Sequence, residues 1–312
     1  MKDNDKQPYL YHFMPIHKFI DFALNKALKF TSLTYMEDKL DGISIIDANI
    51  LPSCNLQQSL FDQNNFLKLI SLIRPEVKIA FNNANRFRNH SLSCCFYYPT
   101  KSEESIAMWK LYSKEDSVAL KIPKQDLESF IKKGNFEHYS ICNNGDNGSG
   151  HNKPIFFQGK VEYLDFFSVK ANESIQQGFL KHIDYSYENE YRILMVNNEE
   201  DIKQWEEKTD EDLKKLRNAS NDKIDPSQKY HNLERKLLND YKYIAYTLNP
   251  KHYKIELSSD LLTKTSIVSS PFIDLWKLNN LKSIIKKLDF NIDFQYSHSL
   301  PKLVVNSLNL NA

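Results

Sequence analysis

The segment YRILMV, residues 191–196, constrains the fold of this chain more than any other stretch. Successive side chains of a strand point to opposite faces of a sheet, and nearly every position of this segment is apolar. A strand that is apolar on both faces lies inside a sheet rather than at its edge. The sequence therefore predicts a central strand at 191–196, with Glu188 and Glu190 where that strand begins.

Short aromatic or apolar segments alternate along the chain with segments of helical periodicity. In the segment 17–27, for example, Phe19, Ile20, Ala23 and Leu24 fall on one helical face. With 312 residues, of which 41% are hydrophobic, the chain can bury a core, and we interpret 1–312 as a single α+β domain. We predict strands at 9–14, 28–32, 91–98, 117–122, 155–165, 191–196, 242–248, 265–270 and 292–297, and helices at 17–27, 56–73, 103–113, 170–183 and 272–288.

Two further segments have a distinct expected role. The sequence from 198 to 240 is charged and helical, which predicts a solvated helical insertion within the domain. In MWKLY, residues 108–112, Trp109 and Tyr112 are three positions apart and share a helical face. We expect Trp109 to be mostly buried and Tyr112 to border the candidate site.

The charge balance and the cysteines limit the class of protein. Lys and Arg number 41 against 40 Asp and Glu, so no overall field attracts nucleic acid or an anionic membrane. Four cysteines without a CxxC pair fit neither a disulfide framework nor a structural zinc site. The chain has no apolar run of about eighteen residues and no secretory leader at its start. These features predict a soluble cytoplasmic protein that does not bind a membrane.

Several catalytic templates are missing from the sequence. It contains no GxGxxG after a strand, no GxxxxGK[ST], no HExxH and no GxSxG. Dinucleotide-binding Rossmann folds, P-loop proteins, zincin proteases and α/β-hydrolases need these residues for their chemistry. Any chemistry of this chain therefore rests on other residues.

The stretch YSYENEYRIL, residues 185–194, places two carboxylates next to an arginine. If the extended conformation begins before 188, Glu188, Glu190 and Arg192 share one face of the strand. Adjacent carboxylates raise each other's pKa, whereas a guanidinium lowers the pKa of both. Two interpretations remain open: a structural ion pair between Glu190 and Arg192, or a chemical site.

Other polar residues also allow two interpretations. His12 lies in YLYHFM among apolar neighbours, which is typical of a core histidine with one bonded nitrogen, although a ligand-holding role is the alternative. Acidic residues near an arginine would also suit Mg²⁺ and phosphate, which gives a metal-dependent nuclease built on Asp38, Asp41 and Glu190 as one hypothesis.

An ordered set of motifs resembles a bacterial family, the domain-of-unknown-function family 2971. The set is LYHF, LKFTSLTYMEDKLDG, SLSCCF, MWKLY, SVALKI and YENEYRIL, and it spans about residues 9 to 297. The family's usual Asn-Asp-Pro-Phe-Glu run is here Glu-Asp-Lys-Leu-Asp at 37–41, so the turn-setting proline is lost. The most specific matches are Met108, Trp109 and Tyr112, followed by Glu188, Glu190, Tyr191 and Arg192.

The order of elements also has a more distant resemblance to the ADP-ribosyltransferase fold. That resemblance implies a split mixed β-sheet core with flanking helices that clasps NAD. It makes His12 the NAD-holding group, Ser91 and Ser93 the supporting strand, and Glu190 the catalytic acid. Glu188 would steer the acceptor, and Tyr112 and Arg192 would complete the cofactor-binding set, with no metal.

We therefore expect an NAD-dependent ADP-ribosyltransferase-like enzyme. It would transfer ADP-ribose to an unknown protein or nucleic-acid acceptor, or hydrolyse NAD, in bacterial stress or anti-phage defence. The alternatives are a non-catalytic module that senses a nucleotide or nucleic acid, and the metal-dependent nuclease. The geometric criterion for the transferase is that His12, Tyr112 and Glu190 line one cleft.

Overall fold

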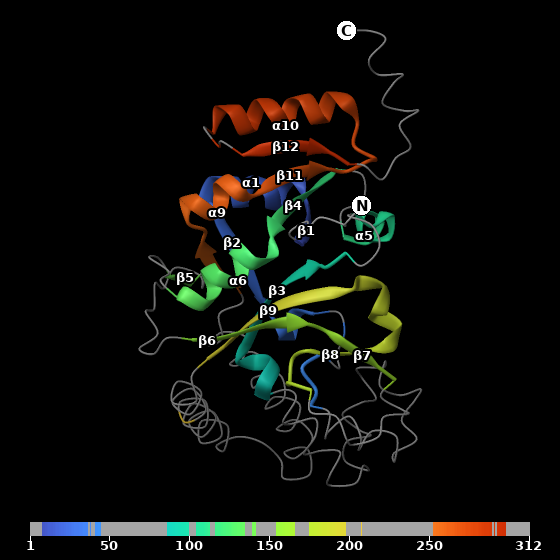
Figure 1. Cartoon of the computed structure of the whole chain (residues 1–312), viewed down its shortest axis with the longest axis vertical. Helices are drawn as coiled ribbons and strands as arrows, with labels where there is room; N and C mark the ends of the chain where they lie inside the picture. The colour runs from blue at the N-terminus through green and yellow to red at the C-terminus, as the bar shows by residue number, and fades with distance from the viewer. Residues whose placement is uncertain are drawn as a thin grey trace, which may run out of the picture.

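The computed structural model describes the sheet and the elements around it (Figure 1). The described residues are 8–36, 38, 41–44, 86–99, 104–112, 116–134, 139–141, 154–165, 175–197, 207, 252–288, 290 and 292–297. Within them, no helix is both long enough and apolar enough to cross a membrane. Three predictions lie outside the described residues: the helix at 56–73, the strand at 242–248, and the insertion at 198–240 apart from Glu207.

Strands and helices are mixed along the chain, which confirms the α+β class. The strands are β1 (Tyr9–Pro15), β2 (Ala27–Ser32), β3 (Ser91–Tyr97), β4 (Ser117–Pro123), β5 (Tyr139–Ile141), β6 (Ile155–Lys160), β7 (Glu162–Leu164), β8 (Leu180–His182), β9 (Glu190–Val196), β10 (His252–Glu256), β11 (Ser266–Ser269) and β12 (Asp293–Tyr296). The helices are α1 (Ile16–Asn25), α5 (Ile106–Tyr112), α6 (Lys124–Lys133), α9 (Ser259–Lys264) and α10 (Leu275–Lys287), with short 3₁₀ helices η1 (Leu33–Tyr35) and η3 (Ile183–Glu188).

In the described part of the chain, ten strands form one sheet. The order is β12-β11-β4-β1-β3-β2-β10-β5, with β9 paired to β3 and β6 paired to β9. All these neighbours are antiparallel except β11 and β12, which are parallel. β7 and β8 form a separate parallel pair. In Figure 1 the strands β12, β11, β4 and β1 lie above β3, β9 and β6.

The strand β9 is an interior strand of this sheet. It pairs over seven residues with β3 and over six with β6. Its residues 190–195 are all buried, so both faces of the strand are covered. The prediction of a central strand at 191–196 is therefore confirmed.

The sheet opens between β1 and β3. These two strands share one residue pair, Tyr11 with Tyr97, whereas β1 pairs with β4 over seven residues. The same edge of β3 pairs with β2 further along the strand, at Leu92 and Ser93. Cys95 lies between these two contacts, and its carbonyl oxygen is 2.7 Å from Nδ1 of His12. The His12 side chain thus contacts β3 where the backbones of β1 and β3 do not pair.

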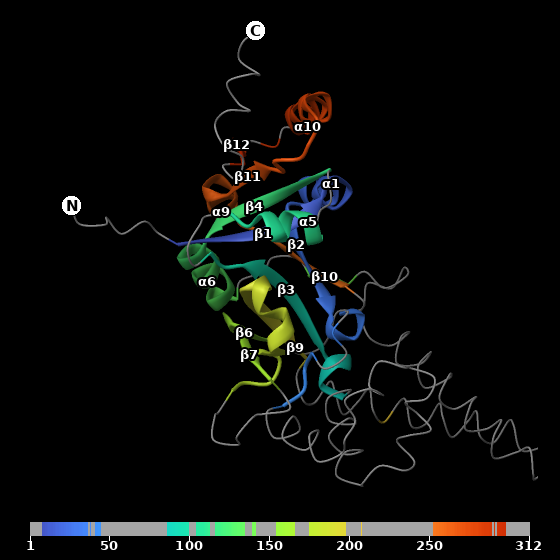
Figure 2. The same cartoon turned by 90° about the vertical axis from the view of Figure 1, so that its right-hand side faces the viewer.

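Each face of the sheet has its own core, and helices cover both. On one face, side chains of α1, α6, α9 and α10 pack with alternate residues of β1, β3, β4 and β9. On the other face, α5 packs Met108 and Trp109 against Tyr11, Phe13 and Tyr97. Trp109 is fully buried, as the sequence predicts, and its ring meets that of Phe13 edge-on at 4.7 Å. In Figure 2, α5 lies beside β1.

Two sequence predictions are wrong in detail. The described residues 175–183 of the predicted helix at 170–183 contain a turn followed by β8, which pairs with β7. Gly178 has φ of 87° in this turn, and a Cβ atom there would lie 2.8 Å from Leu194 Cδ2, so only glycine fits without rearrangement. In α1 the buried face is Phe19, Phe22 and Ala23, while Leu24 is 62% exposed.

Candidate functional site

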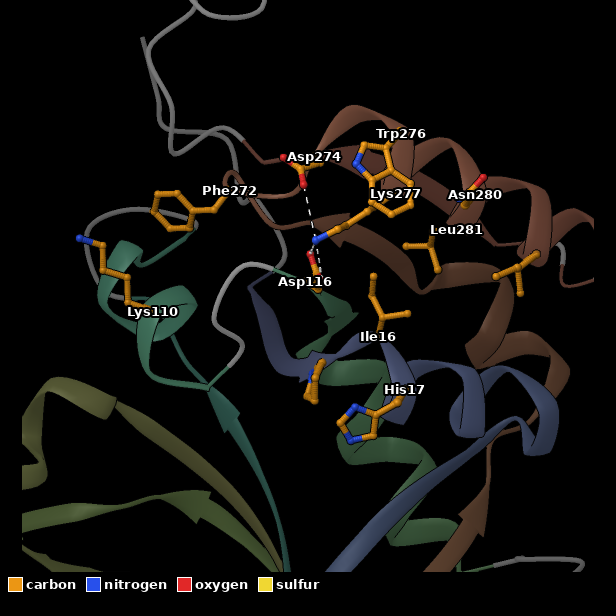
Figure 3. Close-up of a pocket in the computed structure, with 12 residues that line it drawn as sticks. Ile16, His17, Lys110, Asp116, Phe272, Asp274, Trp276, Lys277, Asn280 and Leu281 are labelled. Atoms are coloured by element: carbon orange, nitrogen blue, oxygen red, sulfur yellow. Dashed lines mark hydrogen bonds and ion pairs between the residues drawn. The ribbon is translucent and has the colours of Figure 1, made fainter.

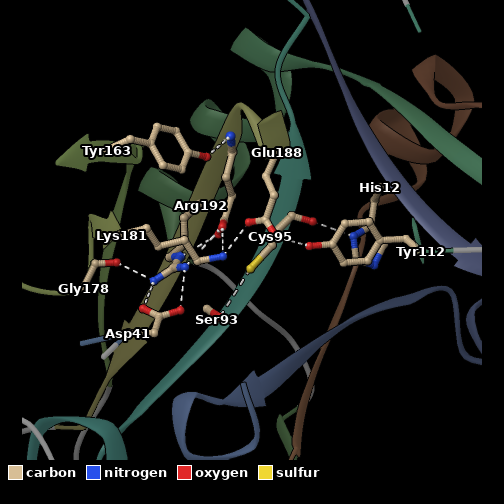
Figure 4. Close-up of polar contacts among 11 residues, drawn as sticks. His12, Asp41, Ser93, Cys95, Tyr112, Tyr163, Gly178, Lys181, Glu188 and Arg192 are labelled. Carbon is tan, nitrogen blue, oxygen red and sulfur yellow. Dashed lines mark hydrogen bonds and ion pairs between the residues drawn. The ribbon is translucent and has the colours of Figure 1, made fainter. Parts of the chain in front are cut away.

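A cluster of buried charged side chains lies on the α5 face of the sheet, where β9 begins (Figure 4). We call it the charge cluster and define it as Asp41, Lys181, Glu188, Glu190 and Arg192. Asp41 precedes the turn at Gly42, Lys181 is the middle residue of β8, and Glu188 ends η3. Glu190 and Arg192 alternate along β9, so they lie on the same face of the sheet.

Arg192 is fully buried and uses every hydrogen that its guanidinium can donate. It binds both oxygens of Asp41 at 2.7 and 2.9 Å, both oxygens of Glu190 at 2.6 and 3.2 Å, and the carbonyl of Gly178 at 2.6 Å. Because a guanidinium has five N–H groups, none is left for a ligand. Arg192 therefore holds the loop at Asp41 and the turn at Gly178 against β9.

Lys181 joins the two glutamates. Its Nζ lies 2.5 Å from Glu188 Oε2 and 2.9 Å from Glu190 Oε2. Burial alone would lower the pKa of Lys181, but Glu190 and the other neighbouring carboxylates outweigh it and raise that pKa above its usual value. Lys181 is therefore a charged ammonium in a buried site.

Tyr112 connects the cluster to the surface. Its side chain is 46% exposed, and its hydroxyl donates a 2.5 Å hydrogen bond to Oε1 of Glu188, which is only 6% exposed. Burial and the adjacent Glu188 raise the pKa of Tyr112, so the hydroxyl keeps the proton that it donates. As the sequence predicts, Tyr112 borders the site while Trp109 on the same helix is buried.

The charges of the cluster do not balance. Asp41, Glu188 and Glu190 are three carboxylates, and Lys181 and Arg192 are two cations, which leaves one negative charge in excess. Glu190 contacts both cations, and Asp41 binds the guanidinium with both oxygens. Of the two cations, Glu188 contacts only Lys181, and it shares that ammonium with Glu190. The excess negative charge therefore lies mainly on Glu188.

A turn before β9, rather than the alternation of side chains along the strand, positions Glu188. β9 begins at Glu190, and Asn189 has φ of 39°, in the left-handed region where few residues other than glycine are found. The backbone N–H of Tyr98 donates to the carbonyl of Asn189 at 2.9 Å, which ties this turn to the end of β3. The expected face-sharing along one strand thus holds for Glu190 and Arg192, whereas Glu188 enters the cluster from η3.

Neutral polar groups complete the surroundings of Glu190. The backbone N–H of Glu190 donates to the Tyr163 hydroxyl at 2.8 Å. Cys95 lies beside Glu190, and its Sγ is 3.5 Å from Ser93 Oγ. Burial raises the pKa of the Cys95 thiol, and the charge of Glu190 raises it further, so the thiol stays protonated and is not a nucleophile here.

The structure brings only some of the predicted site residues together. Tyr112, Glu188, Glu190 and Arg192 belong to one network, and Ser93 reaches it through Cys95. Ser91 lies at the other end of β3, opposite Val196.

His12 lies on the opposite face of the sheet from the charge cluster. Its neighbours Tyr11 and Phe13 share a face with Tyr97 and therefore with Cys95, so His12 points the other way. Its ring packs at 5.3 Å against Phe96, in the core covered by α1 and α6. Burial lowers the pKa of His12, which favours the neutral ring. His12 therefore does not line one cleft with Tyr112 and Glu190, and the geometric criterion that the ADP-ribosyltransferase resemblance sets is not met.

The sequence did not predict Lys181, Cys95 or Tyr163 as residues of the site. The signal for Lys181 was a lysine directly after the apolar pair Phe179 and Leu180, which become buried. The helix predicted at 170–183 hid this signal, because a lysine on a helix usually reaches solvent.

The acidic residues of the nuclease hypothesis are not arranged as a metal site. In the part of the chain that the structure describes, no group of three or more His, Cys, Asp or Glu side chains is placed to hold a metal ion. Asp41 and Glu190 direct their oxygens at Arg192 instead.

A separate groove lies between α5, α10 and the start of α1 (Figure 3). Its cavity measures about 1280 Å³, and its lining includes Lys110, Phe272, Trp276 and Lys277. Lys277 binds Asp116 at 2.7 and 2.8 Å and Asp274 at 3.4 Å, so this lysine is compensated. None of the residues of the charge cluster lines this groove.

The ion pairs of Glu190 predict how stability changes with pH. Burial alone would raise the pKa of Glu190, but Arg192 and Lys181 outweigh it and hold that pKa well below the usual carboxyl range. A lowered folded-state pKa stabilises the protein above the unfolded value of about 4.3, and this contribution is lost as the pH falls.

We expect urea unfolding at a series of pH values to show a steeper loss of stability below about pH 4 in the parent than in Glu190→Gln. Identical pH slopes in the two proteins would contradict this assignment of charge.

Comparison with known proteins supports the family resemblance over part of the chain. Residues 108–193 match the family model described as Protein of unknown function (DUF2971). The matched segment contains Tyr112, Lys181, Glu188, Glu190 and Arg192, while Asp41 lies outside it. No curated protein and no solved structure matches the chain.

Proposed function

We propose that the chain cleaves the bond between nicotinamide and ribose in NAD, with Glu188 as the carboxylate that faces the ribose. The observation that carries this proposal is the excess negative charge on Glu188, which accepts a hydrogen bond from the half-exposed Tyr112. ADP-ribose then passes to an acceptor group or to water.

The chemistry needs a fixed negative charge at one place. As the C1′–N bond breaks, its electron pair leaves with nicotinamide, and positive charge develops on the ribose. A carboxylate beside the ribose stabilises this charge more in the transition state than in the ground state. Glycosidases use carboxylates in the same way. The acceptor oxygen or nitrogen then bonds to C1′ and releases its proton.

Glu188 suits this role better than Glu190, to which the resemblance assigns it. Glu190 is 4% exposed and contacts both Arg192 and Lys181, so its charge is already compensated. Two nearby cations reduce the field that a carboxylate exerts on a third charge. In our proposal Glu190 positions Lys181 and anchors β9.

Tyr112 and the neighbouring tyrosines of η3 fit a cationic aromatic ring. Tyr112 and Tyr187 are each about half exposed, and Tyr185 has its ring 5.4 Å from the Lys181 ammonium. Tyrosine faces attract cations, and the nicotinamide ring of NAD is a pyridinium cation. His12 has no direct contact with NAD in this proposal, because it holds β3 through the Cys95 carbonyl on the other face.

The proposal is tested by incubating the purified protein with NAD, with and without a chelator, and measuring free nicotinamide and ADP-ribose. We expect nicotinamide release that the chelator leaves unchanged. Release of nicotinamide without free ADP-ribose would identify transfer, and equal release of both would identify hydrolysis. Binding of NAD without release would favour the sensing module, and chelator-sensitive cleavage of nucleic acid would favour the nuclease.

A further inference from the structure

The ammonium of Lys181 occupies a site that is built for a cation. Two carboxylate oxygens lie 2.5 and 2.9 Å from it, and the Tyr185 ring centroid lies 5.4 Å away. Carboxylates combined with an aromatic face are the groups with which proteins bind organic cations. The cation site, which adjoins the half-exposed Tyr112, is therefore occupied by the chain's own Lys181 ammonium.

The Lys181 ammonium has a second carboxylate, that of Glu190, within hydrogen-bonding distance. Lys181 already contacts Glu190 at 2.9 Å, so it can give up Glu188 without losing every counter-charge. Glu188 would keep the hydrogen bond from Tyr112, and Lys181 would no longer offset its negative charge. If a ligand cation replaced the ammonium at Glu188, Lys181 would therefore still have a counter-ion.

We propose that the charge cluster selects ligands with a positively charged planar group, and that such a ligand displaces the Lys181 ammonium from Glu188 onto Glu190. The inference rests on the proposed function for its substrate, the pyridinium of NAD, and it adds that the positive charge is the feature recognised. Lys181 then acts as an exchangeable counter-ion and a positioning residue.

The charged and titratable groups around Lys181 come from several elements. They are Tyr185 and Glu188 on η3, Glu190 and Arg192 on β9, Asp41 on the Gly42 turn, Tyr163 on β7, Cys95 on β3 and Tyr112 on α5. Arg192 is the other cation of the cluster, and it is fully bound by Asp41, Glu190 and Gly178. Displacement therefore involves Lys181 rather than Arg192.

Two probes of nearly equal shape test this inference without any turnover. The 1-methylnicotinamide cation carries the positive ring, and nicotinamide has the same ring and amide but no charge. Calorimetric titration of the parent should show binding of the cation at least about tenfold tighter than that of nicotinamide, the scale of a desolvated cation contact. Added salt should weaken binding of the cation alone.

Lys181→Met removes the competing ammonium and keeps a side chain of similar length. We expect it to tighten binding of the cation by a further factor of about ten and to leave binding of nicotinamide unchanged. Lys254→Met is the matched control, because Lys254 on β10 pairs with Asp21 on α1 and belongs to no part of the cluster. It should behave like the parent toward both probes.

A merely structural role for Lys181 would weaken the binding of both probes in Lys181→Met, and that result would overturn the inference. Equal affinity of the parent for the two probes, or no binding of either, would also overturn it. If Lys181→Met does not fold, Glu188→Gln serves instead, and it should reduce the affinity for the cation to that for nicotinamide.

These outcomes are separable from those of the proposed function. A parent that prefers the cation but releases no nicotinamide from NAD would support the cation site and reject the enzyme. A parent that releases nicotinamide but binds both probes equally would support the enzyme and reject the cation site.

Discussion

Replacing Arg192 by methionine is expected to lower the free energy of unfolding by about 3 to 5 kcal/mol, the usual cost of removing one partner of a buried ion pair. Arg192 is fully buried, and its loss leaves Asp41 and Glu190 without the guanidinium that binds both oxygens of each. The carbonyl of Gly178 also loses its donor. Methionine fills most of the volume, so the effect reports the charge rather than a cavity.

Urea unfolding followed by fluorescence or circular dichroism measures this loss. Lys254→Met is again the matched control, since it breaks a partly exposed pair with Asp21 and should cost at most about 1 kcal/mol. Equal and small losses in both variants would show that the charge cluster does not hold the turns at Gly42 and Gly178 against β9.

Replacing Glu188 by glutamine is expected to reduce NAD turnover by at least about a hundredfold, the scale of removing one preorganised electrostatic group. Glutamine keeps the shape of the side chain and can still accept the hydrogen bond from Tyr112. It removes the charge that stabilises the developing cation on the ribose. Lys181 retains Glu190 as its counter-ion, so we expect the melting temperature to change little.

The same substitution at Glu190 should have the opposite pair of effects. Glu190→Gln leaves Arg192 and Lys181 with one carboxylate fewer in a buried site. Loss of a buried counter-charge destabilises the fold, so the melting temperature should fall clearly. Turnover by the folded fraction should fall less than in Glu188→Gln, because the Glu188 carboxylate remains although the cluster loses its excess negative charge.

The centre of the fold could be predicted from the sequence because its signals are local. YRILMV is apolar at successive positions, and that pattern alone indicates a strand covered on both faces. Helical spacing placed Trp109 and Tyr112 on one face, and the expected burial of Trp109 with Tyr112 at the border of the site is confirmed. Glu190 and Arg192 were placed on one face by strand alternation.

The composition of the site depends on contacts that a local pattern does not contain. Asp41 binds Arg192 across 151 positions of sequence, and Lys181 enters the cluster because β8 pairs with β7. The turn at Asn189 changes the direction of Glu188, and the alternation of β1 places His12 on the far face. One-residue differences of this kind decide which carboxylate carries the excess negative charge, and they follow from register rather than from residue type.

The central claim is that Glu188 is the chemical carboxylate and Glu190 the structural one. Its most direct test is the rate of nicotinamide release from NAD by the parent, Glu188→Gln and Glu190→Gln, measured side by side with their melting temperatures. We expect at least about a hundredfold slower release with an almost unchanged melting temperature for Glu188→Gln, and a lowered melting temperature with a clearly smaller loss of release for Glu190→Gln. Unchanged release by Glu188→Gln, or no release by the parent with any acceptor, would contradict the claim.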